Sequence, residues 1–451
     1  MTDSATSTPR ETSHGKPGGL PLHTQIFIGL LIGATLGLVA NFALSRLDKD
    51  ASLHRLLETS IAVAEPLGKV FLRLVLMVVL PLVFSALALG VLELGDLRKV
   101  GRVGLRTLFF TAILSLTAVG IGVGLVGTIK PGARLPVEQR DKLREKYAAQ
   151  AGENVDKAKK AKSISQTLLD IIPENPLQEM VGALDGSSKG NGMLAVMFFS
   201  LVFGIALTAT PDRTGTLVRC LEGLFDVAMV IIGFAMRIAP YAVACLIYAI
   251  TATLGLDILR TLFWFVLTAL VGLSLHLFVV YPIVIWMFTG RKPMSFFRDV
   301  SDAMVTAFGT SSSNATLPTA LRVAEENLSI PREIARFVLT VGATGNQNGT
   351  ALYEGVVVLF LAQVFNVQLD FGQQVAVVLM SVLAGVGTAG VPGGSLPLIV
   401  VVMTSVGVPG EGIGIILGVD RVLDMCRTVL NVTGDLAVAT CVAGRVEAKA
   451  G

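Results

Sequence analysis

The chain has 451 residues, of which 53% are hydrophobic and only 15% are charged, and its formal net charge is +3. This composition excludes an ordinary soluble domain and is typical of a polytopic helical membrane protein. The small net charge implies no nucleic-acid partner. The four cysteines are scattered through apolar stretches and have no metal-ligand or redox spacing.

Apolar stretches dominate the first two thirds of the chain. Residues 1–24 come before them; they are polar and lack the charged start and apolar core of a signal peptide, so we expect a disordered cytoplasmic tail. The second stretch is longer than one span, which predicts tilt or a kink at Pro81. Transmembrane helices are predicted at residues 26–43, 62–92, 108–128, 193–208, 217–254 and 262–288.

A charged region separates the third and fourth spans. Residues 130–162 are dense in Lys, Glu, Asp and Ala, which predicts an exposed and partly helical loop. Span counting places the whole region 130–190 outside the cell, with an interfacial segment at 171–180. The basic links 96–102 and 291–298 are expected in the cytoplasm by the positive-inside rule.

Two segments of the last third share a pattern that the earlier spans lack. Residues 296–327 and 371–406 each have two arms around a polar tip, at 309–318 and 384–395. The arms of the first segment are each only about half a span long, which indicates a hairpin that enters and leaves the membrane on one side. A span follows each hairpin. This order predicts an inverted-topology repeat with a site at the midplane and alternating access.

A broken helix lies between the two hairpins. Residues 341–354 read V-G-A-T-G-N-Q-N-G-T-A-L-Y-E, with apolar helical sequence on both sides. Unwound backbone is tolerated at membrane depth only where protein buries it or it lines a cavity. The amides and hydroxyls of this stretch predict an ion or solute site; the alternative is a kinked helix that packs through small residues. They belong to Thr344, Asn346, Gln347, Asn348 and Thr350.

The final span, 413–442, carries a stripe of polar side chains on one helix face. Ionisable groups inside a membrane are costly, so the stripe predicts a functional site, although a structural pair between Asp424 and Arg427 would explain two of its members. Arg427 offers a fork for a carboxylate, Asp424 can accept an ammonium group, and Asp435 can bind a small cation such as Na⁺. The stripe consists of Asp420, Asp424, Arg427, Asn431 and Asp435. Donors to an anion are also expected at the first tip, from Ser312, Ser313 and Asn314.

Four motifs of this chain resemble those of the glutamate/aspartate transporters of the dicarboxylate/amino acid:cation symporter family. They are the serine-rich tip ending in T-L-P, the segment G-A-T-x-N-x-x-G-T-A-L-Y-E, the tip G-T-A-G-V-P-G and the helix D-x-x-x-D-x-x-R-T-x-x-N-V-x-G-D. The resemblance covers about residues 26–442, and it is strongest after residue 296. The first tip is also similar to that of the animal excitatory amino acid transporters.

The resemblance implies an all-α polytopic membrane protein with eight transmembrane helices and two re-entrant helical hairpins, assembled as an elevator-type homotrimer. It implies the inner or plasma membrane as location, lipid contacts and cytoplasmic termini. A fixed scaffold would support a moving transport domain, with the second hairpin as gate. The implied parts are a tail (1–24), scaffold helices 1–2 (25–104) and 4–5 (191–257), transport-domain helices 3 (105–129) and 6 (258–290), an extracytoplasmic loop (130–190), hairpin 1 (294–328), broken helix 7 (332–367), hairpin 2 (371–408) and helix 8 (411–445).

The resemblance also implies roles for single residues. Arg427 matches the arginine that holds the substrate side-chain carboxylate, and Asp424 matches the acceptor of the substrate amino group. Further substrate contacts are implied for Thr428, Asn431, Ser312, Ser313, Thr350, Val391 and Gly393. One sodium site would use carbonyls of Gly342, Asn346 and Asn431 and the carboxylate of Asp435. A second would use Thr344, Gly385, Val386 and Thr388.

The chain departs from the family pattern in the broken helix. Gln347 replaces a methionine that sits between substrate and sodium, and Asn348 replaces an aspartate of a third, buried sodium site. In the third span, Thr111 and Leu114 stand where that site expects a tyrosine and a threonine hydroxyl, while Ser115 still matches. A buried cation without its carboxylate partner is poorly compensated, so we predict a weak or absent third sodium site.

Glu354 closes the same motif and matches the position tied to proton coupling in animal members, although a hydrogen-bonded structural role is equally open. We therefore interpret the chain as a secondary active importer of aspartate or glutamate, coupled to Na⁺ with H⁺ as a second candidate ion. It needs no cofactor, and no nucleophile–base set or catalytic metal motif points to an enzyme. The alternatives are a C4-dicarboxylate:cation symporter, which Asp424 disfavours, a cation-independent acidic amino acid transporter, an ion channel and a substrate sensor on the same scaffold.

Overall fold

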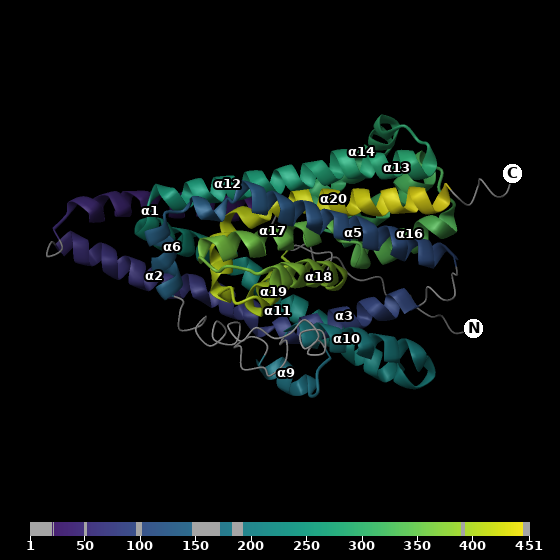
Figure 1. The fold of residues 1–451 in the computed structure, drawn as a ribbon, viewed down its shortest axis with the longest axis horizontal. Coiled ribbons are helices and arrows are strands. Elements are labelled where there is room, and N and C mark those ends of the chain that lie inside the picture. Colours follow the sequence, from purple (N-terminus) through teal and green to yellow (C-terminus); the bar gives the residue numbers. More distant parts are fainter. Residues whose placement is uncertain are drawn as a thin grey trace.

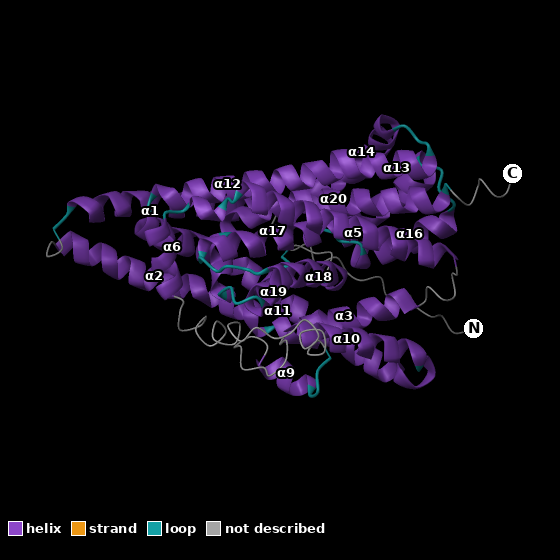
Figure 2. Ribbon diagram, viewed as in Figure 1, coloured by secondary structure: helices purple, strands orange, loops and turns teal. Residues whose placement is uncertain are grey.

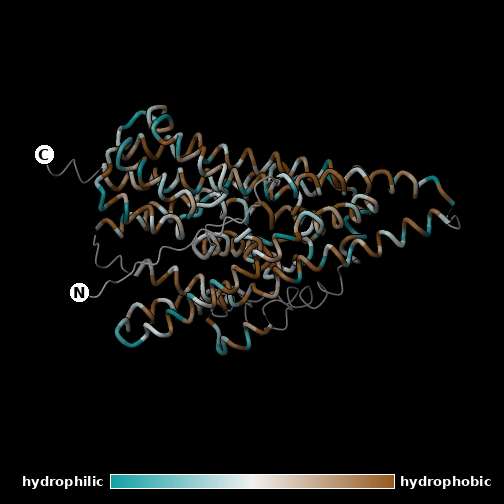
Figure 3. Tube along the Cα trace, turned by 180° about the vertical axis from the view of Figure 1, so that it is seen from behind, coloured by the Kyte–Doolittle hydropathy of each residue, from teal (hydrophilic) through white to brown (hydrophobic). Residues whose placement is uncertain are grey.

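The computed structural model describes residues 20, 22–48, 52–95, 102–146, 172–182, 193–388 and 393–444. Every regular element within these ranges is a helix (Figure 2). The long helices run roughly along the long axis of an elongated body (Figure 1). Hydrophobic residues cover most of the length of these helices, and hydrophilic ones gather at several of their ends and connections (Figure 3). This distribution fits a body whose middle lies in hydrocarbon.

Five helices of the described part are long and apolar enough to cross a membrane. Shorter apolar helices occupy 195–209, 371–385 and 396–405, which gives them at most about 25 Å of length at the usual rise per residue. Hydropathy and length alone therefore account for fewer spans than the eight expected from the resemblance. The five helices are Thr24–Arg46, Ser52–Leu92, Val103–Arg134, Pro211–Leu254 and Leu256–Thr289.

The helices of the N-terminal half form one packed group around α11. Helix α11 is the longest, with 44 residues, and it packs against both α1 and α2, while α10 packs against α3. Backbone contacts hold α1 on α11: a Cβ atom at Gly29 or Gly33 would clash with the carbonyl oxygens of Pro240 and Ala244. The group comprises α1 (Leu22–Arg46), α2 (Ser52–Met77), α3 (Val79–Gly95), α10 (Met193–Ala209) and α11 (Pro211–Leu254).

The second span is interrupted in the turn before Pro81, as the predicted kink requires. It divides at Val78, between α2 and α3, where the proline ring would clash with the Met77 carbonyl of a continuous helix. Pro81 is the third residue of α3, where its missing N–H would have had no intrahelical acceptor and its ring is tolerated. The helical hydrogen bonds resume at Leu82, whose N–H donates to the Val78 carbonyl at 3.0 Å. The proline therefore begins a new helix rather than bending an existing one.

A second group is built around α17, almost all of whose residues are buried. Helix α17 packs against α5, α18 and α20, and α20 in turn packs against α14 and α16 (Figure 1). The predicted sixth span is α12 and α13 joined by the π-helical turn η2. The group comprises α5 (Arg102–Ile129), α12 (Leu256–Leu275), η2 (His276–Val280), α13 (Tyr281–Thr289), α14 (Pro293–Thr310), α15 (Ser313–Arg322), η3 (Val323–Asn327), α16 (Arg332–Gly345), α17 (Asn348–Val364), α18 (Phe371–Gly387), α19 (Leu396–Ser405), η4 (Gly410–Ile415) and α20 (Leu417–Ala443).

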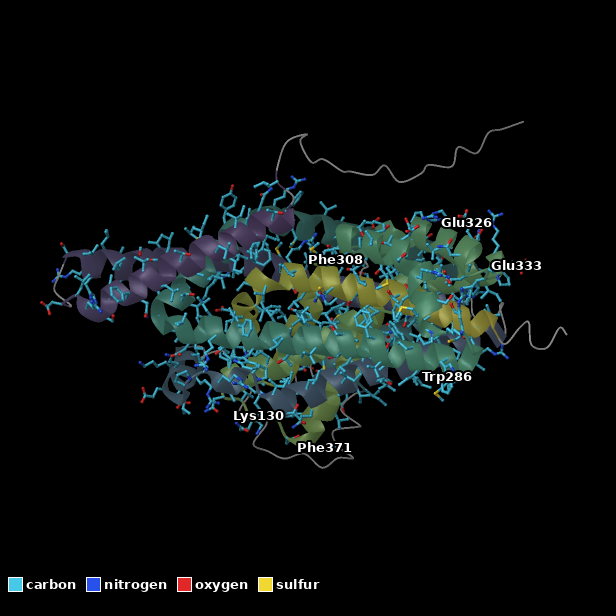
Figure 4. All side chains as sticks on the ribbon, turned by 90° about the horizontal axis from the view of Figure 1, so that it is seen from above. Lys130, Trp286, Phe308, Glu326, Glu333 and Phe371 are labelled. Atoms are coloured by element: carbon cyan, nitrogen blue, oxygen red, sulfur yellow. The ribbon has the colours of Figure 1, made fainter. Side chains whose placement is uncertain are left out.

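Two helix pairs occupy the positions of the predicted hairpins. Helices α14 and α15 pack together around Ser311, which adopts a left-handed conformation with φ of 50°. Phe308, near the end of α14, lies well inside the length of the body, whereas Glu326 and Glu333 lie at one end (Figure 4). Helices α18 and α19 form the second pair, whose tip falls partly outside the described residues. Between the pairs, α16 and α17 are separated by Asn346 and Gln347, as the sequence predicts for a broken helix.

The start of the charged region is attached to the second group. The short helices η1 (Gly132–Arg134) and α6 (Val137–Lys146) follow α5, and Asn366 Nδ2 donates to Asp141 Oδ1 at 3.0 Å. Helix α9 (Pro176–Gly182), which overlaps the segment expected to be interfacial, packs on α10 of the first group. Most of the predicted loop, residues 147–171 and 183–192, lies outside the described part of the chain.

One ion pair joins the two groups. Lys69 Nζ on α2 lies 2.9 Å from Glu411 Oε2 on η4 and 3.3 Å from Glu65 Oε1 one turn earlier on α2. These side chains are partly exposed, with about a quarter of the lysine side chain accessible. The contact therefore connects the first group to the segment between α19 and α20.

Candidate functional site

The polar stripe of α20 is buried. Arg427 is only 1% exposed, and its Nη2 atom donates to Asp424 Oδ1 at 2.8 Å. The same nitrogen lies 3.3 Å from Asp420 Oδ1. Arg421 Nη1 donates to the other oxygen of Asp424, Oδ2, at 3.1 Å. Two arginines and two aspartates thus compensate one another on a single helix face.

Arg427 keeps part of its hydrogen-bonding capacity unused. Its guanidinium lies over the ring of Tyr353, with 4.1 Å from Cζ to the ring centroid. Nε and Nη1 are buried and have no hydrogen-bond partner among the described residues. Buried donors of an arginine are almost always paired, so these two atoms indicate a place for an external acceptor. Their planar arrangement suits both oxygens of a carboxylate.

Asn431 connects α20 to the break between α16 and α17. Its Oδ1 atom accepts the Gly349 N–H at 2.7 Å, and its Nδ2 donates to Gln347 Oε1 and, at 3.2 Å, to Thr350 Oγ1. Gln347 also donates from Nε2 to the Ala343 carbonyl at 2.7 Å. A methionine could make neither amide contact, so Gln347 ties the unwound backbone to α20.

Asp435 lies against the end of α16, where a small cation could be held. Its Oδ1 accepts a hydrogen bond from Asn346 Nδ2 at 2.8 Å. A Cβ atom at Gly342 would clash with this carboxylate, so the glycine permits the close approach. Asn346 Oδ1 is buried and has no partner within the described part. Two side chains therefore place oxygen atoms, the ligand type of hard cations, beside one helix end.

The second helix pair lies beside this region. Gly385 on α18 lies against Ala351 and the Gln347 carbonyl, and Thr388 Oγ1 donates to the Ala384 carbonyl at 2.8 Å. Beyond the tip, Gly393 lies against Met236 of α11. Three residues with implied roles are not placed: Val391 and the side chains of Thr344 and Val386 fall outside what the structure describes.

The tip of the first helix pair is held by its own hydroxyls. Ser312 caps α15, with its Oγ accepting the Ala315 N–H at 3.1 Å, and the Ser312 carbonyl accepts a hydrogen bond from Thr316 Oγ1 at 2.7 Å. Ser313, the first residue of α15, is buried. Helix α15 packs against α20, and Thr428 on α20 donates to the Asp424 carbonyl at 2.9 Å. The start of α15 therefore lies in the same part of the fold as the charged stripe.

Asn348 sits in a neutral and fully buried hydrogen-bond chain. Ser115 Oγ donates to Asn348 Oδ1 at 2.7 Å, and Asn348 Nδ2 donates to the hydroxyl of Tyr281 at 3.2 Å. That hydroxyl donates in turn to the Leu430 carbonyl at 3.0 Å. Leu114, on the same helix as Ser115, is buried and contributes no oxygen. The amide group of Asn348 is thus hydrogen-bonded through both its oxygen and its nitrogen, and the chain carries no charge.

Glu354 is fully buried in α17, and neither of its carboxylate oxygens has a hydrogen-bond partner among the described residues. This observation does not support the structural role that was left open, in which hydrogen bonds hold the side chain. A buried carboxyl group without partners is a feature of sites that exchange protons or ions.

Sequence reasoning missed three residues of this site. Arg421 falls on an unspecified position of the motif, although its spacing to Asp424 equals the spacing from Asp424 to Arg427. Tyr353 and Tyr281 are brought in by tertiary packing alone. No sequence pattern indicates that the first would underlie Arg427 or that the second would reach Asn348.

Comparisons with known proteins find similar sequences along nearly the whole chain. The model of the sodium:dicarboxylate symporter family, whose coupling ion is Na⁺, matches residues 22–445. The "Proton/sodium-glutamate symport protein" of Bacillus subtilis is 32% identical over 422 residues, covering 93% of this chain and 91% of the relative. The "Proton/glutamate-aspartate symporter" of the same organism is 32% identical over 94% of both chains.

Animal proteins are similar as well. The human "Excitatory amino acid transporter 2" is 31% identical over 92% of this chain and 77% of its own length. These relatives are transporters and not enzymes. Both the family match and the identities extend over nearly the whole chain. The protein is a member of the sodium:dicarboxylate symporter family.

Proposed function

We propose that this protein imports acidic amino acids, aspartate or glutamate, by secondary active transport coupled to Na⁺. The observation that carries the proposal is Arg427, a buried arginine with two unused donors next to the carboxylate of Asp424. In this arrangement Arg427 binds the substrate side-chain carboxylate, and Asp424 binds its ammonium group. The names of the bacterial and animal relatives support this substrate class.

Sodium binds beside Asp435 in this proposal. The carboxylate of Asp435 and the unpaired Oδ1 of Asn346 support a site there, with carbonyls of the broken helix completing it. The third sodium site is weak or absent. The neutral chain from Ser115 through Asn348 to Tyr281 supports this, because it leaves no unsatisfied oxygen that a cation would compensate.

Glu354 is the proposed proton carrier. Its burial and its two unpartnered oxygens support a side chain that is neutral in part of the cycle. A proton carried on this group supplies some of the driving force that a missing third sodium would have supplied.

We further propose that the fold works as an elevator in a homotrimer in the cell membrane, with eight spans, two re-entrant hairpins and surrounding lipids. The N-terminal group around α11 is the scaffold, and the group around α17 and α20 moves. The denser packing within each group than between them supports this division. The termini are cytoplasmic; in support, Gly444 at the end of α20 lies against Thr289, beside the basic link.

Uptake into proteoliposomes tests the proposal. Radiolabelled aspartate is supplied outside, and Na⁺ and pH gradients are varied separately. We expect uptake that requires Na⁺, and Arg427→Gln should reduce it at least about 100-fold because the substrate carboxylate loses the two free guanidinium donors that bind it in this proposal. Sodium-independent uptake at constant pH contradicts the coupling, and binding without flux identifies a sensor. A current that needs no substrate identifies a channel.

A second candidate is the symport of C4-dicarboxylates. The sequence disfavours it because Asp424 needs an ammonium partner. The structure shows that both oxygens of Asp424 are already held by arginines, which weakens that objection. Succinate belongs in the same uptake assay for this reason.

A further inference from the structure

The candidate site contains a second buried arginine. The side chain of Arg421 is 10% exposed, and within the described part of the chain it forms an ion pair with Asp424, at 3.1 Å from Nη1 to Oδ2. The other oxygen of Asp424 is held by Arg427. Each oxygen of one carboxylate therefore belongs to a different arginine, and the two contacts can be changed independently.

Arg421 lies beside the second helix pair. It lines a small cavity together with Asp420 and Asp424 of α20, Gly393 of the second helix pair and Phe71 of α2. The walls contributed by α1, α2 and α11 are apolar, so they offer Asp424 no alternative hydrogen-bond donor. Asp424 depends on the two arginines or on a bound ligand for compensation of its charge.

Substrate binding changes only one of the two contacts. The free donors of Arg427 are Nε and Nη1, and a substrate carboxylate that takes them draws this guanidinium away from Asp424. An amino acid replaces this contact, because its ammonium group can bind Asp424. A dicarboxylate has no amino group and leaves that oxygen of Asp424 without a donor. In a site with Arg427 alone, Asp424 would then be a buried carboxylate without a partner. Such a site discriminates by about 10⁴-fold against a ligand that lacks the ammonium group.

We propose that Arg421 determines substrate specificity by keeping Asp424 paired when the ligand has no ammonium group. The site then accepts C4-dicarboxylates such as succinate in addition to acidic amino acids. Arg421 acts through Asp424 and is a positioning residue, which need not touch the substrate. The inference rests on the proposed substrate class of the same site and extends it from amino acids to dicarboxylates.

Competition measures this specificity directly. Full-length protein in proteoliposomes takes up radiolabelled L-aspartate, and unlabelled succinate or L-aspartate is titrated against it. The readout is the inhibition constant of succinate divided by that of unlabelled L-aspartate. We expect this ratio to be below about 100 in the unchanged protein and to rise at least about ten-fold in Arg421→Met and Arg421→Gln, because Asp424 is then unpaired with succinate bound.

Three further variants separate positioning from general damage. Arg421→Lys keeps the charge and should hold the ratio within about three-fold of the unchanged protein. Arg298→Met removes an arginine whose side chain is 81% exposed and should leave both inhibition constants unchanged. Asp424→Asn removes the carboxylate itself, so succinate should approach aspartate in affinity whatever residue stands at 421.

The outcomes are distinguishable. A ratio that stays the same in both charge-removing variants overturns the role of Arg421, even if both affinities fall together. A ratio above about 10⁴ in the unchanged protein also overturns it. Absence of aspartate uptake in the unchanged protein would instead refute the proposed function. If one charge-removing variant does not fold, the other decides the result alone.

Discussion

Replacing Asn348 with aspartate tests whether the third cation site is absent. The variant restores the family residue but places a carboxylate in a site organised for an amide. Ser115 can still donate to one oxygen. The second oxygen would face the hydroxyl of Tyr281, whose hydrogen is donated to the Leu430 carbonyl. The new carboxylate therefore lacks a donor on one side and a counter-charge altogether.

The expected destabilisation follows from these contacts. Losing the hydrogen bond from Asn348 to Tyr281 costs about 1 kcal/mol in the free energy of unfolding. A buried charge without a partner costs about 3 to 5 kcal/mol. The total is about 4 to 6 kcal/mol, which at about 2 °C per kcal/mol lowers the midpoint of thermal unfolding by about 10 °C.

Thermal unfolding of the purified protein in NaCl and in choline chloride provides the assay. Sodium should not rescue Asn348→Asp, because buried Leu114 supplies no oxygen; the double variant with Leu114→Thr should regain stability in NaCl. Asn41→Asp is the matched control, since Asn41 donates a single hydrogen bond to the Ala252 carbonyl away from the site. Our reasoning is refuted if the single variant is as stable as the unchanged protein in choline, or if NaCl alone restores it.

Three further changes address the cation site, the proton and the contact between the helix groups. Gly342→Ala places a methyl group against Asp435 and should weaken Na⁺ binding at least about ten-fold. The control Gly345→Ala has open space around its Cβ position and should change Na⁺ binding by no more than about two-fold. Equal effects of the two variants would contradict the proposed sodium site. Glu354→Gln should keep uptake driven by a Na⁺ gradient and lose the response to an imposed pH gradient; a retained response would assign the proton elsewhere. Lys69→Met removes a partly exposed ion pair between the groups, so the maximal uptake rate should rise about three-fold with little change in thermal midpoint, and slower uptake would exclude a restraining role.

Much of the fold could be predicted because hydropathy reports which residues favour hydrocarbon. The predicted span at 108–128 lies within α5, and the first polar tip and the broken helix fall where one helix ends and the next begins. Local register could not be predicted in this way. The π-helical turn η2 inside the sixth span shifts the helix register just before Tyr281, and an average over an apolar window is insensitive to such a shift.

The site was predicted less completely than the fold. Three-residue spacing on a helix correctly placed Asp424 beside Arg427, because side chains three apart share a face. Gln347 was recognised as unusual, but its bridge to Asn431 and the Ala343 carbonyl depends on how α16 ends, which no pattern specifies. Partners from distant elements, such as Tyr353 under Arg427, follow only from tertiary packing.

The glycine contacts between α1 and α11 have a mechanical consequence. Because Gly29 and Gly33 bring one backbone directly onto the carbonyls of the other, few side-chain rotamers lie between the two helices to rearrange. This pair should therefore behave as one rigid unit, and in the proposed elevator mechanism it should keep its geometry while α20 moves. Spectroscopic labels, one on α1 and one on α11, should therefore report one constant distance through the transport cycle. That distance can serve as a fixed reference for measuring other movements.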